Sequence, residues 1–150
     1  MALFYIETSA LVKLYVREPG TDRILALMSR NQGHRFAVLT ISGVEFHSAI
    51  RRREREGDID PPQARRLLKR FSEHMETKYV RQSINDSLLD VAANLVDRYP
   101  LRAYDAVQLA GWLIVRSHSG KDYPTFVTSD HRLIDAAGTE GIPFLDPSAS

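Results

Sequence analysis

Four acidic residues occupy positions in the sequence from which they could act on one substrate. Glu7 and Asp130 each follow a short apolar run of the kind that forms a buried strand. Glu45 and Asp105 lie near the start of helical apolar repeats, close to faces otherwise suited to burial. Because an isolated carboxylate is costly to bury, Glu45 and Asp105 are candidates for a functional role, and the strand-end positions of Glu7 and Asp130 make them candidates as well.

A divalent cation would explain these acids if the fold brings them together. Their mutual repulsion would require compensation, and a hard ion that prefers oxygen ligands, Mg²⁺ or Mn²⁺, is the expected partner. Such an ion can polarise a phosphodiester and make a bound water more acidic, which suits a nuclease or a phosphoryl transferase. A single acid near a helix start is more often a solvated or capping residue. The repeated order of strand, acid and helix reduces the advantage of that explanation but does not remove it, so both explanations stay open at this point.

The elements that must position the acids follow from the hydrophobic pattern. A buried strand over Leu3–Ile6 is predicted to deliver Glu7 to a turn, and a helix follows from Thr8. A capping box of Ser83 with Asp86 is expected to start the helix that carries Leu88, Leu89 and Ala92. Further strands are expected over 35–40, 79–82, 125–128 and 142–145, and further helices over 21–28, 42–56, from 61, over 102–118 and after 130. This alternation predicts one α/β domain over 1–150, with a central, mainly parallel sheet flanked by helices.

Composition narrows the class of protein. With 150 residues, 43% of them hydrophobic, the chain can bury one core but not two comfortable ones. The lack of Cys excludes disulfides and thiolate metal sites, and no apolar run approaches membrane-spanning length. Because no signal-like segment precedes the first strand, we expect a cytoplasmic protein without a membrane partner. The formal net charge of +1 neither favours nor excludes a polyanionic partner.

Four stretches of the chain together resemble a known family. They are Ile6–Tyr15 with Glu18–Gly20, then Ser42–Glu45, then Leu101–Ala110, then Val127–Leu133. In that order they resemble the PIN-domain family and, more narrowly, the VapC toxins of bacterial and archaeal toxin–antitoxin modules. The match runs over almost the full chain, and four ordered motifs are more specific than any one of them.

The resemblance implies a compact and usually dimeric PIN fold that cleaves RNA with Mg²⁺ or Mn²⁺ held by acidic residues. It also implies a cognate antitoxin as a protein partner. The family's catalytic and metal-binding roles fall on Glu7, Glu45, Asp105 and Asp130, and its supporting hydroxyls on Thr8 and Thr128. The prediction is therefore a metal-dependent endoribonuclease that is the toxin of a toxin–antitoxin pair.

The first acid departs from the family pattern, because Glu7 stands where the family has Asp. Its carboxylate reaches one methylene further, and magnesium tolerates misplaced ligands poorly. The departure leaves open a shifted but active site, a preference for manganese, or a weakened PIN module that binds RNA or a protein without cutting. A phosphotransfer receiver-like domain is an alternative outside the family, although no Lys follows a late strand as that class requires.

Positive charge gathers in the middle of the sequence. Arg51, Arg52 and Arg53 are candidate contacts for RNA phosphates near the metal site. A solvated helix face that pairs with nearby acids such as Glu54 is the alternative explanation. Lys13, on the first helix, is predicted to be an outer-face charge.

Overall fold

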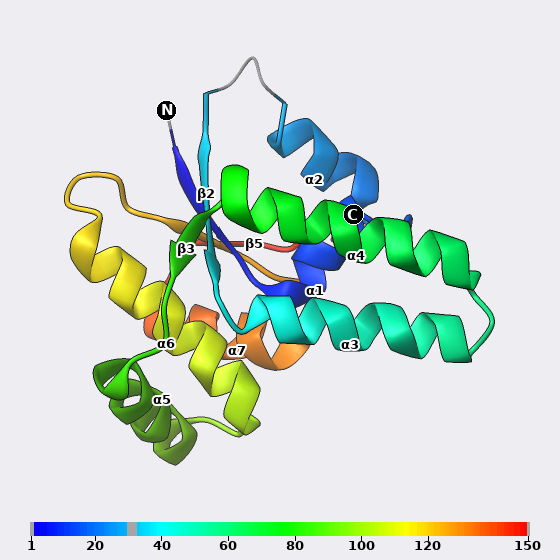
Figure 1. Ribbon diagram of the computed structural model, residues 1–150. Coiled ribbons are helices and arrows are strands. Elements are labelled where there is room, and N and C mark those ends of the chain that lie inside the picture. The colour runs from blue at the N-terminus through cyan, green and yellow to red at the C-terminus, as the bar shows by residue number, and fades with distance from the viewer. Residues whose placement is uncertain (1, 30–32, 150) are drawn as a thin grey trace.

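Strand β1 (Leu3–Ile6) lies at the centre of a five-stranded sheet with the order β3-β2-β1-β4-β5 (Figure 1). The computed structural model describes residues 2–29 and 33–149. The neighbours of β1 are β2 (Arg35–Leu39) and β4 (Thr125–Val127), and the edges are β3 (Val80–Gln82) and β5 (Phe144–Leu145). Each pair of neighbouring strands is parallel. The predicted α/β domain with a parallel sheet flanked by helices is confirmed.

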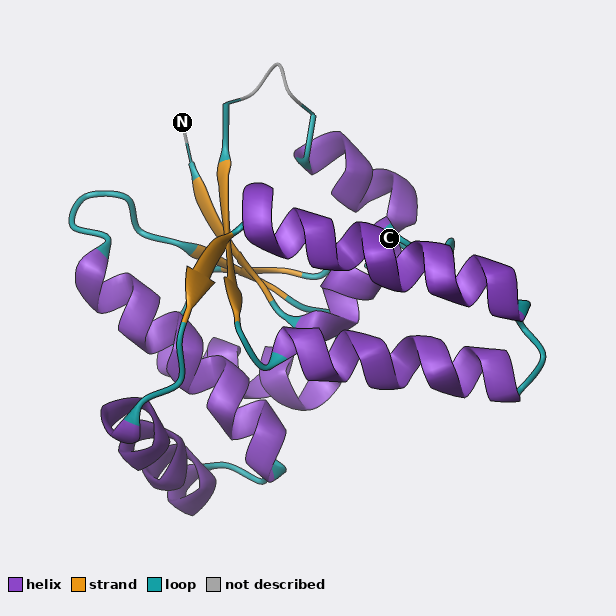
Figure 2. Ribbon diagram, viewed as in Figure 1, coloured by secondary structure: helices purple, strands orange, loops and turns teal. Residues whose placement is uncertain are grey.

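Helices connect the strands, as Figure 2 shows. They are α1 (Thr8–Leu11), the 3₁₀ helix η1 (Val12–Leu14), α2 (Thr21–Leu27), α3 (Ser42–Arg55), α4 (Pro61–Thr77), α5 (Asp86–Arg98), α6 (Ala103–His118) and α7 (His131–Glu140). The predicted capping box of Ser83 with Asp86 is wrong. The side chain of Asn85 caps α5 instead, since its Oδ1 accepts a hydrogen bond of 2.9 Å from the amide of Leu88. Among the described residues, no helix is both long and apolar enough to cross a membrane.

The sheet separates two hydrophobic clusters because successive side chains of a strand point to opposite faces. Leu3 and Tyr5 pack with α5, α6 and α7, whereas Phe4 and Ile6 pack with the helices from α1 to α4. On the first face Trp112 is 1% exposed, and its indole N–H donates to the carbonyl of Pro124. Burial on both faces explains why β1 is apolar throughout instead of alternating with polar residues.

The carboxyl ends of β1 and β4 mark the point where the strand order reverses. From β1 the chain crosses to β2 and β3 on one side, and β4 and β5 are added on the other. Ile6 pairs with Val127, and the amide of Glu7 donates to the carbonyl of Val127 at 2.9 Å. Ligands of open α/β sheets bind outside such a point. This edge therefore positions the candidate site, and α3 and α4 run side by side away from it (Figure 1).

Candidate active site

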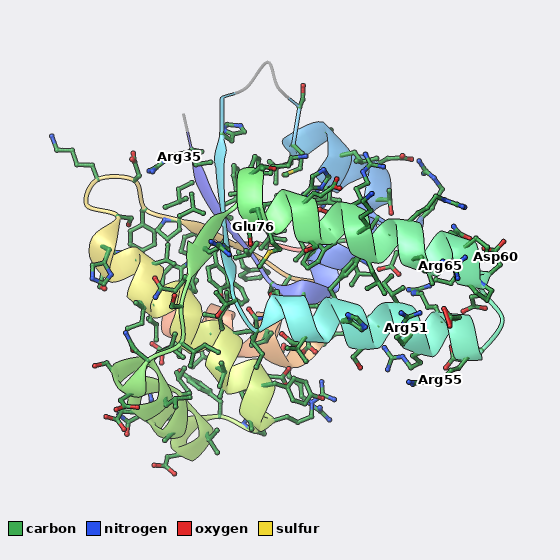
Figure 3. The ribbon with its side chains drawn as sticks, in the orientation of Figure 1. Arg35, Arg51, Arg55, Asp60, Arg65 and Glu76 are labelled. Carbon is green, nitrogen blue, oxygen red and sulfur yellow. The ribbon has the colours of Figure 1, made fainter. Side chains whose placement is uncertain are left out.

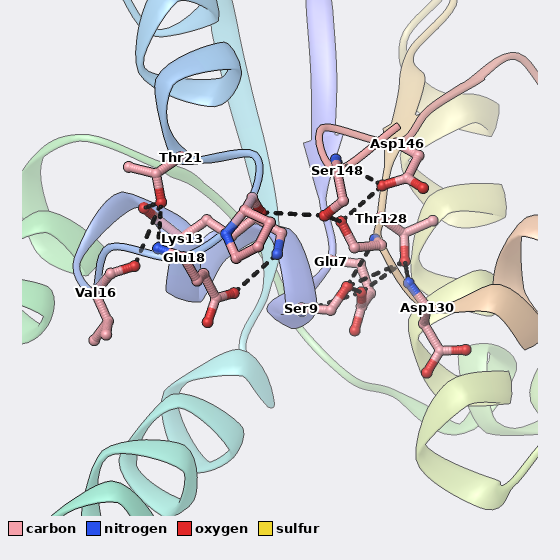
Figure 4. Close-up of polar contacts among 12 residues, drawn as sticks. Glu7, Ser9, Lys13, Val16, Glu18, Thr21, Thr128, Asp130, Asp146 and Ser148 are labelled. Atoms are coloured by element: carbon pink, nitrogen blue, oxygen red, sulfur yellow. Dashed lines mark hydrogen bonds and ion pairs between the residues drawn. The ribbon is translucent and has the colours of Figure 1, made fainter. Parts of the chain in front are cut away.

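Glu7 ends β1 and caps the amino terminus of α1. Its Oε2 accepts three hydrogen bonds: from the Ser9 amide at 3.1 Å, from the Ser9 hydroxyl at 2.5 Å and from the Thr128 hydroxyl at 2.8 Å (Figure 4). The residue is only 6% exposed. Burial raises the pKa of Glu7 to about 7, although these hydrogen bonds act in the opposite direction and stabilise the carboxylate. Glu7 is thus a fixed carboxyl group that titrates near neutral pH.

Glu45 reaches the same place from the first turn of α3. Its Oε1 accepts hydrogen bonds from the Thr8 hydroxyl at 2.9 Å and from the Gln108 amide at 2.6 Å. Gln108 also donates to Thr8 and Ser42, and its own oxygen accepts from the buried Tyr5 hydroxyl. Burial raises the pKa of Glu45 as well. A polar network in the core therefore holds this carboxylate in place.

Asp105 and Asp130 lie at the amino-terminal ends of α6 and α7. The Asp105 carboxylate accepts from the Arg102 amide at 3.3 Å and from the Arg102 Nε at 3.0 Å. The Asp130 Oδ1 caps α7 by accepting from the amides of Arg132 and Leu133. Its Oδ2 lies 3.5 Å from Nη2 of Arg102. Arg102 therefore connects the two acids.

The four acids share one pattern of bonding. In each, one oxygen is anchored by hydrogen bonds from the protein. Within the described part of the chain, the other oxygen of Glu7, Glu45 and Asp105 accepts no hydrogen bond, and that of Asp130 has only the long contact with Arg102. No fully buried side-chain oxygen of the described residues lacks a partner, so these second oxygens each keep some exposed surface, although Glu7 and Asp105 are themselves largely buried. They are the atoms available to a ligand.

An open groove of about 750 Å³ is lined by two of the four acids, Glu7 and Glu45, and continues along α3; Asp105 and Asp130 pair with Arg102 and do not line it. Glu7, Glu45 and Arg102 lie along it together with Arg52 and Arg53. The groove therefore combines an acidic part with a basic part, the combination that a metal-dependent enzyme acting on a polyanion requires.

The predicted basic residues divide between two places. Arg52 and Arg53 line the groove, whereas Arg51 lines a neighbouring hollow on α3 and pairs with Glu54 at 3.0 Å. Arg51, Arg55 and Arg65 lie on the parts of α3 and α4 that project beyond the sheet (Figure 3). The structure thus combines both explanations of this cluster, a groove lining and a paired helix face.

The prediction that Lys13 is an outer-face charge is wrong. Lys13 is only 6% exposed, because its ammonium group pairs with Glu18 at 2.9 Å on the opposite side of the site from Asp130 (Figure 4). The other carboxylate oxygen of Glu18 pairs with Arg53 at 2.5 Å. Glu18 therefore fixes two cations at the basic part of the groove, a pairing that helical periodicity cannot reveal.

The four acids are near one another without forming a closed cage. The charge of Glu45 raises the pKa of Glu7, and the charge of Asp105 raises that of Glu45. As the side chains stand, no three carboxylate or imidazole groups among residues 2–29 and 33–149 are gathered at metal-binding spacing. The donor chemistry is that of a hard divalent ion, while Arg102 takes up part of the negative charge.

Comparison with known proteins adds a second line of evidence. A model of the PIN domain family matches residues 4–138. The chain belongs to the PIN domain family. It is 30% identical over 149 residues to ribonuclease VapC46 of Mycobacterium tuberculosis (strain ATCC 25618 / H37Rv), which covers 99% of this chain and 100% of that one. It is 28% identical to ribonuclease VapC47 of Mycobacterium tuberculosis (strain CDC 1551 / Oshkosh), with 98% of both chains covered.

Solved structures agree with this assignment of the fold. A toxin–antitoxin complex from Klebsiella pneumoniae contains a chain that superposes with a TM-score of 0.64. The sequence identity is 18%, and 98% of each chain is covered. At that identity the likeness supports the fold alone. It shows that the complete α/β architecture, and not merely the central sheet, is shared.

Several residues of this PIN domain site were not among the predicted ones. Ser9 and Gln108 hold the carboxylates of Glu7 and Glu45, and Arg102 joins Asp105 to Asp130. A helical signal was available for two of them, since Gln108 lies three residues after Asp105 on α6, and Arg102, the residue that caps this helix, lies three residues before it. No comparable signal links Ser9 to Thr128, because their proximity depends on the pairing of β1 with β4.

Proposed function

We propose that this PIN domain is a metal-dependent endoribonuclease that hydrolyses RNA phosphodiester bonds, and that it acts in the cytoplasm as the toxin of a toxin–antitoxin pair. The observation that carries the proposal is the pattern of the four acids: each has one oxygen anchored by the protein, and the second oxygen is unbonded or, in Asp130, has only the long contact with Arg102. Similarity over the full length to two VapC ribonucleases supports RNA as the substrate.

The donor set fits Mg²⁺ or Mn²⁺. The ligands we propose are Glu7, Glu45, Asp105 and Asp130. Burial raises the pKa of Glu7 and of Glu45 more than their hydrogen bonds lower it, and a bound cation would favour the charged form of both groups. A bound ion would supply the charge that polarises the phosphodiester and makes the attacking water more acidic.

The residues of the chain keep the carboxylates in position before any substrate arrives. Thr8 and Gln108 hold Glu45, and Ser9 holds Glu7, all from helices or strand ends and not from long loops. Sites supported in this way lose little free energy to reorganisation. Because the hydroxyls of Thr8 and Ser9 orient carboxylates, we propose water as the nucleophile.

The basic part of the groove is the proposed contact for RNA phosphates. Arg53 and Lys13 are fixed by Glu18, whereas Arg52 makes no ion pair with any residue that the structure describes. A cation without an internal partner can neutralise a phosphate without first breaking a salt bridge. Arg52 is therefore the strongest candidate among the predicted RNA contacts.

A PIN module that binds RNA or a protein without cutting is the second candidate function. The observation that favours it is Glu7, which replaces the Asp of the family and uses one oxygen as a helix cap. The two candidates differ in metal binding. Calorimetric titration with Mn²⁺ distinguishes them: an active nuclease should bind Mn²⁺, whereas a weakened module should show no Mn²⁺ binding at any concentration tested.

The deciding experiment is an RNA cleavage assay on the purified full chain, freed of any partner and supplied with Mn²⁺. Wild type should cleave RNA from a broad pool. Glu45→Gln and Asp105→Asn should each cleave at least about 100-fold more slowly, since each removes a charged ligand. Glu76→Gln, an exposed carboxylate on α4, is the matched control. If wild type cleaves nothing while Glu7→Asp does, the second candidate replaces the first.

Two protein partners belong to the same proposal. We infer a cognate antitoxin and a homodimer. The similar chain of known structure belongs to a toxin–antitoxin complex, which supports the first of these partners. Light scattering on the purified chain tests the homodimer. Co-expression with a candidate antitoxin, followed by the cleavage assay on the purified complex, tests whether the antitoxin binds the chain and inhibits RNA cleavage.

A further inference from the structure

The guanidinium group of Arg102 lies between two of the four acids. Its Nε is 3.0 Å from Oδ2 of Asp105, and its Nη2 is 3.5 Å from Oδ2 of Asp130. The two acids come from different helices, so Arg102 links elements that are distant in the sequence. Arg102 also lines the groove that Glu7 and Glu45 line.

The two contacts of Arg102 differ in strength. Asp105 is 4% exposed and accepts a hydrogen bond of ordinary length, whereas Asp130 is 22% exposed and its contact is at the limit of hydrogen-bond distance. The Arg102 side chain itself is 48% exposed and lies over the ring of Tyr104, at 4.7 Å from its centroid. Ion pairs exposed to this degree contribute little free energy. The contact with Asp130 can therefore open at small cost.

The carboxylates do not depend on the guanidinium for their positions. The backbone amide of Arg102 also donates to Asp105, at 3.3 Å. Asp130 is held through Oδ1 by the amides of Arg132 and Leu133. If the guanidinium moves, both acids stay at their helix ends, and Oδ2 of Asp130 becomes available to another cation.

We propose that Arg102 is a resident counter-cation of the candidate metal site. It neutralises Asp105 and Asp130, and a divalent ion that binds the acids displaces it from Asp130. Its charge therefore sets the ion concentration that the site requires. This inference rests on the proposed function, since it presupposes that a divalent ion binds the four acids.

The inference has a signature that a purely structural role lacks. Without an ion, loss of the Arg102 charge leaves like charges uncompensated and lowers the stability. With an ion, the same loss removes a repulsion and tightens binding. Because the coupling between two sites is reciprocal, the variant that is less stable without the ion must gain more stability from it. A residue that only packs would weaken both states alike.

The test measures Mn²⁺ binding by calorimetry and thermal unfolding in EDTA and in Mn²⁺, on the full chain. Arg102→Gln removes the charge, and Arg102→Lys keeps it. Arg116→Gln is the matched control, because Arg116 lies on the same helix over the ring of Tyr123, at 4.1 Å, and pairs with no acid among the described residues. Arg102→Met, which keeps the apolar contact with Tyr104, serves if Arg102→Gln does not fold.

We expect the neutral Arg102 variants to bind Mn²⁺ about tenfold more tightly than wild type, as removal of a like charge near the ion requires. Arg102→Lys and Arg116→Gln should stay within about threefold of wild type. Equal or weaker binding by the neutral variants overturns the inference, as does equal binding by Arg102→Gln and Arg102→Lys. If neither wild type nor the neutral variants bind Mn²⁺, the proposed metal function is refuted, and the inference falls with it.

Discussion

Glu7 should make the stability of the protein fall as the pH rises when divalent ions are absent. Burial raises its pKa from 4.5 to about 7, and the nearby charge of Glu45 adds to the increase. A carboxyl group with a higher pKa in the folded chain binds more protons when folded. Its contribution is therefore fully present below pH 4.5 and is lost as the pH rises through 7. The difference corresponds to about 3 kcal/mol, or a melting temperature lower by roughly 6–12 °C.

Glu7→Gln tests this directly, because the amide cannot titrate yet keeps the volume and an oxygen that can accept from Ser9 and Thr128. Thermal unfolding in EDTA is followed from pH 5 to pH 8.5. Wild type should lose stability over this range, and the variant should lose much less, with a remainder due to Glu45. Glu76→Gln, on a side chain that is 67% exposed, controls for the loss of a surface charge. If the stability of the variant depends on pH as strongly as that of wild type, Glu7 is not the source of the pH dependence.

Three further outcomes follow from the core and the groove. Gly111→Ala should destabilise the fold by about 1–3 kcal/mol, because a Cβ there would overlap the Tyr5 hydroxyl; chemical denaturation measures it. Tyr5→Phe removes that hydroxyl and its hydrogen bond to Gln108, so it should lower the free energy of unfolding less in the Gly111→Ala background than in wild type. Additive effects of the two substitutions in this double-mutant cycle would contradict the overlap between the Cβ and the hydroxyl. Arg52→Ala should weaken RNA binding and reduce the salt dependence by about one phosphate contact, while Arg55→Ala, in the neighbouring hollow, should not.

The sequence was sufficient for the parts of the fold that local patterns control. The apolar run before Glu7 predicts β1, and its bounds agree with the structure. The helical phase of Asp105 places it on a face suited to burial, and the residue is 3% exposed. Parallel strands place their carboxyl ends at one edge, so the strand-to-acid order at Glu7 and Asp130 also predicts that these residues lie near each other. Each of these predictions depends on spacing within one or two elements.

Long-range pairing decided what the sequence could not reveal. Lys13 has the sequence setting of a surface charge, but Glu18 folds back on it and also binds Arg53, which comes from α3. The contact between Arg102 and Asp130 likewise joins α6 to α7. Such pairs depend on how the helices pack and not on periodicity. Asn85 and not Ser83 caps α5; both residue types make good caps, so their side-chain chemistry alone does not distinguish them.

The position of Glu7 gains a physical explanation from its hydrogen bonds. Its Oε2 is held by Ser9 in the first turn of α1 and by Thr128 directly after β4, and Oε1 is the oxygen left for a ligand. An Asp at this position would withdraw the carboxyl group by about 1.5 Å, the length of one carbon–carbon bond. An Asp could still accept from the Ser9 amide, as Asp130 accepts from the amide of Arg132, but its carboxylate would lie further from the Ser9 and Thr128 hydroxyls. The extra methylene of Glu7 brings Oε2 within hydrogen-bond distance of both hydroxyls and of the Ser9 amide.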